Sequence, residues 1–284
     1  MKNIMFQKYH GNGNDFIIID SRNSIIYDEF LRNKLFKVSS LCDRHFGIGS
    51  DGVIFVIDPK GSNDAKMIIY NSDNSEAEMC GNGIRCLIEY LNNESTIKKD
   101  SFKIETKSGL KLAKYENGLI SVSMGEPIFN PKLIPTKINS FNKKIPFSKF
   151  NLEGFSEIGY SVGMGNPHLI FFVDDLSKID HIFWGPILEN SELFPEKTNV
   201  HFCQILDKYN LNVKVWERGA GVTLACGTGA CAVHVAAYKL GLINHKTTIN
   251  LPGGKLFIEW NDNNKEVIMT GEANHIFKGS YALN

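Results

Sequence analysis

The chain has 284 residues, of which 43% are hydrophobic and 22% charged, a composition typical of a soluble globular protein. Lys and Arg together number 31, and so do Asp and Glu, so bulk charge favours neither nucleic acid nor an anionic membrane as a partner. No apolar run approaches a membrane span, and the first residues contain no signal-peptide core. We therefore expect a cytoplasmic protein, in a reducing compartment, that acts on a small molecule.

The first 60 residues predict strands joined by glycine-rich loops. Residues 1–20 predict a strand, a loop and a second strand, and residues 28–41 have the apolar spacing of a helix. Gly47-Ile48-Gly49-Ser50-Asp51-Gly52 matches the G-x-G-x-x-G string of dinucleotide-binding loops. However, it precedes the strand predicted at residues 53–57 instead of following one. We interpret it as a turn that leads into a strand.

A cysteine followed by glycines stands at the start of the next predicted helix. Residues 67–70 predict a strand, and Asn71 follows it directly. Cys80-Gly81-Asn82-Gly83 then leads into helical spacing of apolar residues between 84 and 91. Residues 102–124 predict further strands, and the pattern then breaks at a series of prolines.

The second half repeats this order. Gly165-Asn166 precedes the strand predicted at residues 169–173, as Gly13-Asn14 precedes Phe16. Glu217 lies nine residues before Cys226 (226 − 217), and Asn71 lies nine before Cys80 (80 − 71). The helix predicted after Cys226, over residues 230–240, is apolar nearly all round and should be buried.

The repeat predicts an α/β (α+β) protein of two lobes related by a pseudo-twofold axis, with the site at their interface. We place the N-terminal lobe at residues 1–125 plus 273–284 and the C-terminal lobe at 126–272. The alternative is that glycine-rich turns recur by chance.

The six cysteines contain no Cys-x-x-Cys pair. Cys80 and Cys86 lie six residues apart, and Cys226 and Cys231 lie five apart, which on a helix puts the sulfurs on different faces. A zinc site built from either local pair is therefore not expected. Cys86 and Cys231 are expected to be small core residues.

Cys80 and Cys226 are suited to proton transfer at carbon. A proton next to a carboxylate is very weakly acidic, and inverting that carbon requires a base on one face and an acid on the other. A helix N-terminus can lower the pKa of a thiol and hold a carboxylate on free N–H groups. The N–H groups expected to do so belong to Gly81, Asn82, Gly227 and Thr228. Neither a metal nor another cofactor would then be needed.

These motifs together resemble the diaminopimelate epimerase family. The matching stretches are His10-Gly11-Asn12-Gly13-Asn14-Asp15-Phe16, Asn71, Met79 to Cys86, Gly165-Asn166-Pro167-His168, Thr198-Asn199-Val200, and Glu217 to Gly221 followed by Ala225 to Cys231. They span the whole chain. The resemblance implies a cofactor-independent enzyme that interconverts LL- and meso-diaminopimelate, in lysine and peptidoglycan precursor synthesis, with Cys80 and Cys226 as the two bases.

The resemblance also implies the remaining site residues and the assembly. The residues that would bind substrate are Asn14, Asn71, Asn166, Asn199, Glu217 and Arg218, and His168 and Glu217 would tune the thiols. The implied fold is two lobes, each a β-sheet wrapped around a central helix, in a homodimer. Some family members carry a substrate-binding glutamine where this chain has Gly52, so that role is not transferred.

Other interpretations remain open at this point. A proline racemase-like or hydroxyproline epimerase-like enzyme would share the two cysteines, but Glu217-Arg218 argues for a substrate with a distal carboxylate. A thiol redox or metal-binding protein would use Cys80 and Cys226 differently. Taken singly, Asn14 and Asn166 could be turn residues, Glu217 and Arg218 a surface pair, and His168 a half-buried structural histidine. Arg85 could line the site or brace the helix start.

Overall fold

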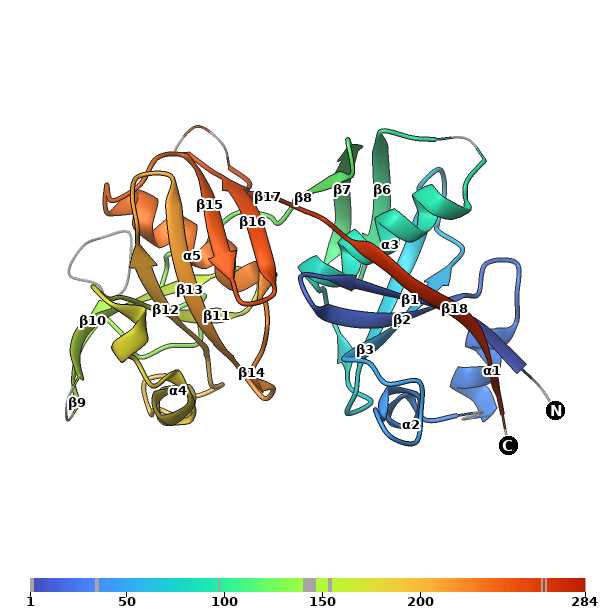
Figure 1. Cartoon of the computed structure of the whole chain (residues 1–284), viewed down its shortest axis with the longest axis horizontal. Coiled ribbons are helices and arrows are strands. Elements are labelled where there is room, and N and C mark those ends of the chain that lie inside the picture. The colour runs from blue at the N-terminus through green and yellow to red at the C-terminus, as the bar shows by residue number, and fades with distance from the viewer. Residues whose placement is uncertain are drawn as a thin grey trace. The chain divides into compact units, whose positions relative to one another are not determined.

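The structure is a computed structural model that describes residues 3–33, 36–96, 98–139, 147–152, 155–261, 263 and 265–283. The chain divides into two compact units (Figure 1). Unit 1 comprises Met1–Val122 and Gly271–Asn284, and unit 2 comprises Ser123–Thr270. None of the helices within the described residues has the length and hydropathy of a membrane span.

In its described residues, unit 1 is a mixed sheet with three helices. Its strands are β1 (Asn3–Gly11), β2 (Asn14–Asp20), β3 (Gly52–Ile57), β4 (Ala65–Asn71), β5 (Glu76–Ala77), β6 (Ser101–Thr106), β7 (Gly109–Glu116), β8 (Leu119–Ser123) and β18 (Asn274–Ala282). Its helices are α1 (Ile26–Asn33), α2 (Val38–Cys42) and α3 (Gly81–Glu94). The pairs β2–β3 and β4–β6 are parallel, whereas β18–β1, β1–β2, β3–β4, β4–β5, β6–β7 and β7–β8 are antiparallel.

Unit 2 is built on the same plan. Its strands are β9 (Phe147–Leu152), β10 (Phe155–Gly163), β11 (Pro167–Phe172), β12 (Asn199–Ile205), β13 (Asn210–Glu217), β14 (Gly221–Val222), β15 (Lys246–Leu251), β16 (Gly254–Glu259) and β17 (Ile268–Gly271). Its helices are the 3₁₀ turn η1 (Leu176–Lys178), α4 (His181–Glu189) and α5 (Gly227–Lys239). Here β11–β12 and β13–β15 are parallel, and β9–β10, β10–β11, β12–β13, β13–β14, β15–β16 and β16–β17 are antiparallel.

The pairing schemes of the two units match strand for strand. Strands β1 to β5 correspond to β10 to β14, helix α3 corresponds to α5, and β6 to β8 correspond to β15 to β17. The two parallel pairs fall at the same places in each scheme. The internal repeat predicted from the sequence is therefore present in the strand topology.

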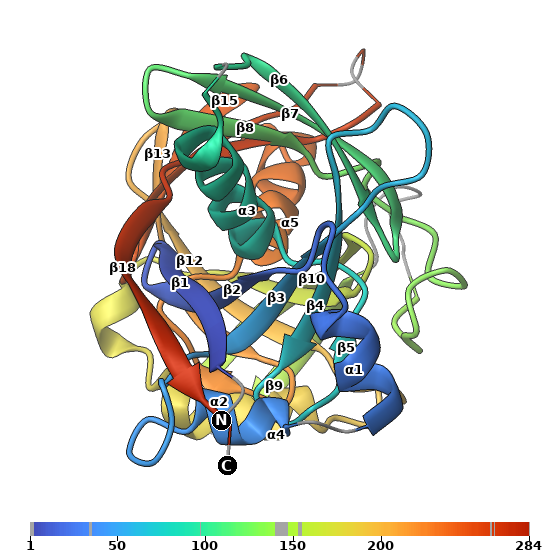
Figure 2. The same ribbon diagram turned by 90° about the vertical axis from the view of Figure 1, so that its right-hand side faces the viewer.

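Each unit buries the helix that follows its Cys-Gly motif, α3 or α5, against its own sheet. Helix α3 packs on β1, β2, β3, β4 and β18 (Figure 2), and α5 packs on β10, β11, β12, β15 and β16. Cys86 on α3 and Cys231 on α5 are both 0% exposed, as predicted. Residues 229–237 of α5 are all buried, because small alanines and valines allow the strands to approach it on every side.

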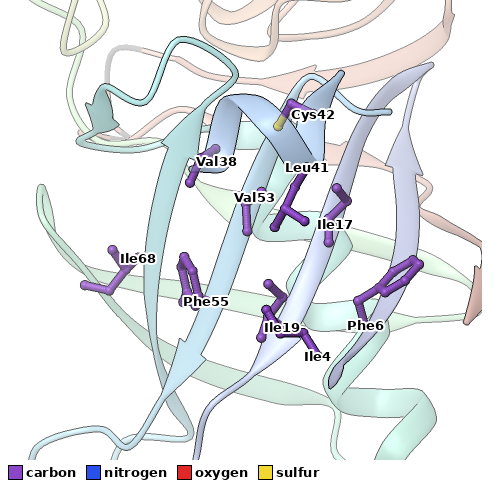
Figure 3. Packing of buried hydrophobic residues seen from close by; sticks show 10 residues of the cluster. All are labelled: Ile4, Phe6, Ile17, Ile19, Val38, Leu41, Cys42, Val53, Phe55 and Ile68. Atoms are coloured by element: carbon purple, nitrogen blue, oxygen red, sulfur yellow. The ribbon is translucent and has the colours of Figure 1, made fainter. Parts of the chain in front are cut away.

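A second layer covers the opposite face of each sheet. In unit 1, Val38 and Leu41 of α2 pack on Ile17 and Val53 (Figure 3). In unit 2, the corresponding cluster joins Leu188 of α4 to residues such as Phe171 and Phe202. With helices on both faces, a strand such as β2 is buried at successive residues, which explains its continuous apolar run.

The structure corrects one predicted helix and decides, at α4, a segment for which the sequence left a helix or a loop open. Residues 28–41 form the two helices α1 and α2 instead of one, with residues 34–35 outside the described part. Phe30 and Phe36 both stack near Phe55 of β3. Gly185 allows α4 to pack closely on Trp216, since a Cβ there would be 2.3 Å from the indole.

Candidate active site

Cys80 and Cys226 occupy the same structural position in their respective units. Each is the N-cap residue of a buried helix and has an extended backbone, with φ −139° and ψ 119° at Cys80 and φ −118° and ψ 109° at Cys226. The Sγ of Cys80 accepts the N–H of Gly83 at 3.4 Å, and the Sγ of Cys226 accepts the N–H of Gly229 at 3.3 Å. Both sulfurs therefore lie at the positive end of a helix dipole, where an anion is favoured.

In unit 1, two predicted asparagines lie beside the Cys80 thiol. The Oδ1 of Asn14 accepts a hydrogen bond from the amide of Asn82 at 3.1 Å and lies 3.8 Å from the Sγ of Cys80. The other end of the Asn14 amide donates to Oδ2 of Asp51 at 2.8 Å. The structure thus brings Cys80, Asn14 and Asn82 together at the start of α3.

A charged network that sequence reasoning missed holds Asp51 in place. The guanidinium of Arg44 bonds Asp51 and Asp15, each at 2.8 Å, and the ammonium of Lys8 lies 2.9 Å from Asp15. Burial opposes the ionisation of Asp15, but hydrogen bonds from Arg44 and Lys8 leave its pKa below the usual value. The spacing of residues in the sequence does not predict such a network, because its members come from three separate segments of the chain.

Asn71 and Gly52 pair at the end of the neighbouring strands. They are partners in the β3–β4 register, and the amide of Asn71 donates to Oγ of Ser75 at 3.0 Å. A Cβ on Gly52 would lie only 2.6 Å from the carbonyl oxygen of Tyr70. The backbone of this chain therefore leaves no room for a glutamine at position 52 without a local shift.

Arg85 braces the helix start. Its side chain is 0% exposed, and its guanidinium donates to Oδ1 of Asn12 at 2.6 Å, to Oδ1 of Asn82 at 2.9 Å and to the carbonyl of Glu272 at 3.2 Å. These contacts tie the segment between β17 and β18, and the first loop, to α3. The structure therefore favours the bracing interpretation over a position within the site.

In unit 2, the environment of Cys226 disfavours its thiolate. Burial raises the pKa of the Cys226 thiol well above its usual value, and the Glu217 carboxylate, which accepts a hydrogen bond from the thiol, raises it further. The hydroxyl of Thr228, 3.5 Å away, and the N–H of Gly229 only partly oppose these effects. The expectation that the helix N-terminus brings this pKa towards neutrality is not met, because burial and Glu217 raise the pKa by more than the Thr228 and Gly229 hydrogen bonds lower it.

His168 is completely buried, contrary to the interpretation as a half-buried structural histidine. Its Nδ1 lies 2.9 Å from Nε2 of His201, and its Nε2 lies 2.7 Å from Oδ1 of Asn166. Burial, with the nearby His201 and Arg218, lowers the pKa of His168 well below its usual value, so the imidazole is neutral. Sequence reasoning did not select His201, although strand alternation puts it on the same face as Asn199.

Asn199 supports the turn that carries Arg218. Its Oδ1 accepts the backbone N–H of Arg218 at 3.0 Å, and its amide donates to the carbonyl of Pro167 at 2.9 Å. The exposed guanidinium of Arg218 donates to the carbonyl of Glu196 at 3.0 Å. Glu217 accepts the hydroxyl of Thr223 at 2.5 Å.

The repeat also shows which site residues have no counterpart in the other unit. In the parallel pairs, Phe16 is the partner of Gly52, and His168 is the partner of Asn199. His168 and Asn199 in unit 2 therefore stand where unit 1 has Phe16 and Gly52. The imidazole and the amide at this place are specific to unit 2.

The arrangement of two α/β units with matching strand order defines a class of fold that several solved structures share. A hydroxyproline epimerase from Agrobacterium vitis matches with a TM-score of 0.70 at 13% identity, covering 100% of this chain and 92% of that one. A PhzF-family phenazine biosynthesis protein from Bacillus anthracis matches with a TM-score of 0.64 at 17% identity, covering 99% and 100%. At such identities the likeness shows the fold alone.

Sequence comparison is more specific. The model of the family described as diaminopimelate epimerase matches residues 6–130 and 160–276. A diaminopimelate epimerase of Prochlorococcus marinus (strain NATL1A) is 48% identical over 281 residues, 98% of this chain and 99% of that protein. The one from Synechocystis sp. is 43% identical over 277 residues, 97% and 98% of the two chains. The chain belongs to the diaminopimelate epimerase family.

Proposed function

We propose that this chain catalyses the interconversion of LL- and meso-2,6-diaminopimelate without a cofactor, as a step of lysine and peptidoglycan precursor biosynthesis. Membership of the family supports this reaction. The observation that carries the chemistry is the matched pair of cysteines, each capping a buried helix with its Sγ on the N–H of a glycine three residues further on.

In the proposed reaction, one thiolate removes the α-proton and the other thiol delivers a proton to the opposite face of the same carbon. Each lobe, residues 1–125 plus 273–284 and residues 126–272, supplies one of the two sulfurs. The backbone N–H groups of Gly81-Asn82 and Gly227-Thr228 hold the α-carboxylate and stabilise the negative charge that it gains in the transition state.

Glu217 and His168 are assigned to the control of the unit 2 thiol. The hydrogen bond from the Cys226 thiol to the Glu217 carboxylate keeps Cys226 protonated, and the carboxylate can receive that proton when Cys226 acts as a base. The neutral imidazole of His168 orients Asn166 through a 2.7 Å contact.

The remaining polar side chains are assigned to the rest of the substrate. Arg218 is exposed and can bond the distal carboxylate in a bidentate manner, while Asn14, Asn71, Asn166 and Asn199 bind its other polar groups. We further propose that the enzyme is cytoplasmic and a homodimer.

A proline racemase-like activity is the competing function, since the same fold occurs in a hydroxyproline epimerase. Incubation in D₂O with LL-diaminopimelate or with L-proline, with no metal or cofactor added, separates the two. We expect deuterium at the α-carbon of diaminopimelate alone, and loss of incorporation in Cys80→Ser and Cys226→Ser. Deuterium in proline, or exchange that requires an added metal, contradicts the proposal.

A further inference from the structure

Unit 2 contains a buried group of three side chains with metal-ligand chemistry. The candidate ligand atoms of His168, His201 and Cys226, one from each residue, all lie within 4.8 Å of one another. His168 and His201 are 0% exposed, and Cys226 is 4% exposed. The three come from β11, β12 and the N-cap of α5, so the rigid core of the unit holds them together.

The hydrogen bonds around the imidazoles leave one nitrogen unsatisfied. Because Nε2 of His168 faces the side-chain oxygen Oδ1 of Asn166, this nitrogen carries the proton, and Nδ1 of His168 then accepts from Nε2–H of His201. The Nδ1 of His201 is consequently a lone pair, and it is buried with no hydrogen-bond partner among the described residues. Such an orphaned acceptor costs free energy unless something binds it.

The local charge favours a cation next to these nitrogens. The Glu217 carboxylate lies next to the Cys226 sulfur and is a negative charge beside any cation bound there. Two neutral imidazoles and a thiolate are ligands that suit zinc, with Zn–N distances of about 2.0–2.1 Å and Zn–S of about 2.3 Å. For both imidazoles to bind the ion, the hydrogen bond from Nε2–H of His201 to Nδ1 of His168 must break, so that His168 coordinates through Nδ1 and the ring of His201 turns a nitrogen lone pair towards the ion.

We propose that His168, His201 and Cys226 form a binding site for a soft divalent cation such as Zn²⁺. Binding joins the sulfur to the metal and releases the thiol proton to solvent. While the metal is bound, Cys226 can neither remove nor deliver a proton, so the site is inhibitory; this second part rests on the proposed function. His201 is then a metal ligand that the epimerase chemistry itself does not require.

Titration of the full chain with Co²⁺, a spectroscopic substitute for Zn²⁺, tests the site directly. We expect one equivalent to give a thiolate-to-cobalt charge-transfer band and the visible bands of a tetrahedral centre. Cys226→Ser should abolish the charge-transfer band, and Cys80→Ser should retain it. His201→Asn should weaken binding by at least about 10-fold, the lower end of what loss of a supporting group costs a metal site.

His234→Asn is the matched control, because His234 is also a buried histidine of unit 2 but bonds Thr247 at 2.7 Å, outside the cluster. Thermal unfolding of each variant without metal shows whether it is folded. If Cys80→Ser and Cys226→Ser lose the band equally, or if His234→Asn weakens binding as much as His201→Asn, the assignment of these three residues as the metal ligands is contradicted.

Turnover assays separate the site from the function. We expect Zn²⁺ to inhibit the enzyme, a chelator to restore activity, and His201→Asn to need at least about 10-fold more Zn²⁺ for the same inhibition. A Cys226-dependent cobalt spectrum in a protein without diaminopimelate turnover would overturn the proposed function and leave the site standing. Turnover that saturating Zn²⁺ leaves unchanged would overturn the inhibitory role.

Discussion

At the scale of single residues, the orientation of the Asn14 amide is fixed by its neighbours. An ionised carboxylate can only accept hydrogen bonds, so Asp51 forces the Asn14 nitrogen towards itself and the oxygen towards Cys80 and Asn82. Arg44 holds Asp51 from the other side. The charge on a partly exposed residue thereby determines which atom of Asn14 the Cys80 thiol faces.

Asp51→Asn removes this constraint, because an amide can donate as well as accept and lets Asn14 turn over. We expect kcat to fall about 10-fold or more, because the loss of one positioned polar group typically slows an acid–base reaction by at least this factor. The melting temperature should change little, since Asp51 is 42% exposed at its side chain. Steady-state kinetics and thermal unfolding measure the two effects. Asp58→Asn, at a surface carboxylate that bonds Asn23, is the control.

At the scale of elements, Gly83 and Gly229, each three residues after a cysteine, allow neighbouring side chains to pack close to the start of the helix. A Cβ on Gly229 would lie 2.2 Å from Cε1 of His201, whereas a Cβ on Gly83 would lie 3.2 Å from Cδ1 of Ile69. The first approach is to a buried ring, and the second is to the tip of a flexible side chain. The two helices are thus equivalent in topology, but α5 tolerates a side chain at its third residue less well than α3 does.

Gly229→Ala should therefore destabilise the protein by about 1–3 kcal/mol, as overpacking of a core does. Gly83→Ala should cost less, because Ile69 can move by a few tenths of an ångström. Denaturant unfolding of the two variants gives the comparison. Equal losses of stability would show that the approach of His201 to α5 is not as close as described.

Helix α4 supports the turn that carries Glu217 and Arg218. The carboxylate of Glu189, 5% exposed, accepts Nε1–H of Trp216 at 2.7 Å and the N–H of Gly219 at 3.0 Å. Glu189 thus bonds both flanks of the Glu217-Arg218 pair. A carboxylate at the C-terminal end of a helix is unfavourably placed in the helix dipole, and these two bonds, with the Lys197 ammonium 3.9 Å away, compensate for its position.

Glu189→Gln leaves one of the two N–H groups without an acceptor, because the amide NH₂ that replaces one oxygen cannot accept. We expect a loss of about 1–3 kcal/mol in the free energy of unfolding, together with a raised KM as the Arg218 turn loosens. Chemical denaturation and substrate saturation curves measure both. Glu192→Gln, at an exposed glutamate of the following turn, should leave stability and KM unchanged.

At the scale of the whole molecule, the repeated topology explains why the two-unit fold could be predicted from the sequence. The Cys-Gly-x-Gly motifs and the spacing of nine residues to Asn71 and Glu217 indicated the duplicated strand–loop–helix unit before any coordinates. Strand β18 could not be predicted from its own pattern, because most of its residues are exposed and it exists through pairing with β1. The two-residue spacing from Asn199 could have indicated His201, whereas the role of Asp51 became visible only through its contacts with Asn14 and Arg44.

The central claim is that two sulfurs act on opposite faces of one carbon, and an isotope experiment tests it most directly. LL-diaminopimelate carrying deuterium at both α-carbons is converted in ordinary water and analysed at low conversion. Two bases predict that the meso product carries solvent hydrogen at the inverted carbon while the remaining LL substrate keeps its deuterium. If the deuterium reappears at the inverted carbon of the product, a single group carries the proton across, and the two-cysteine account is contradicted.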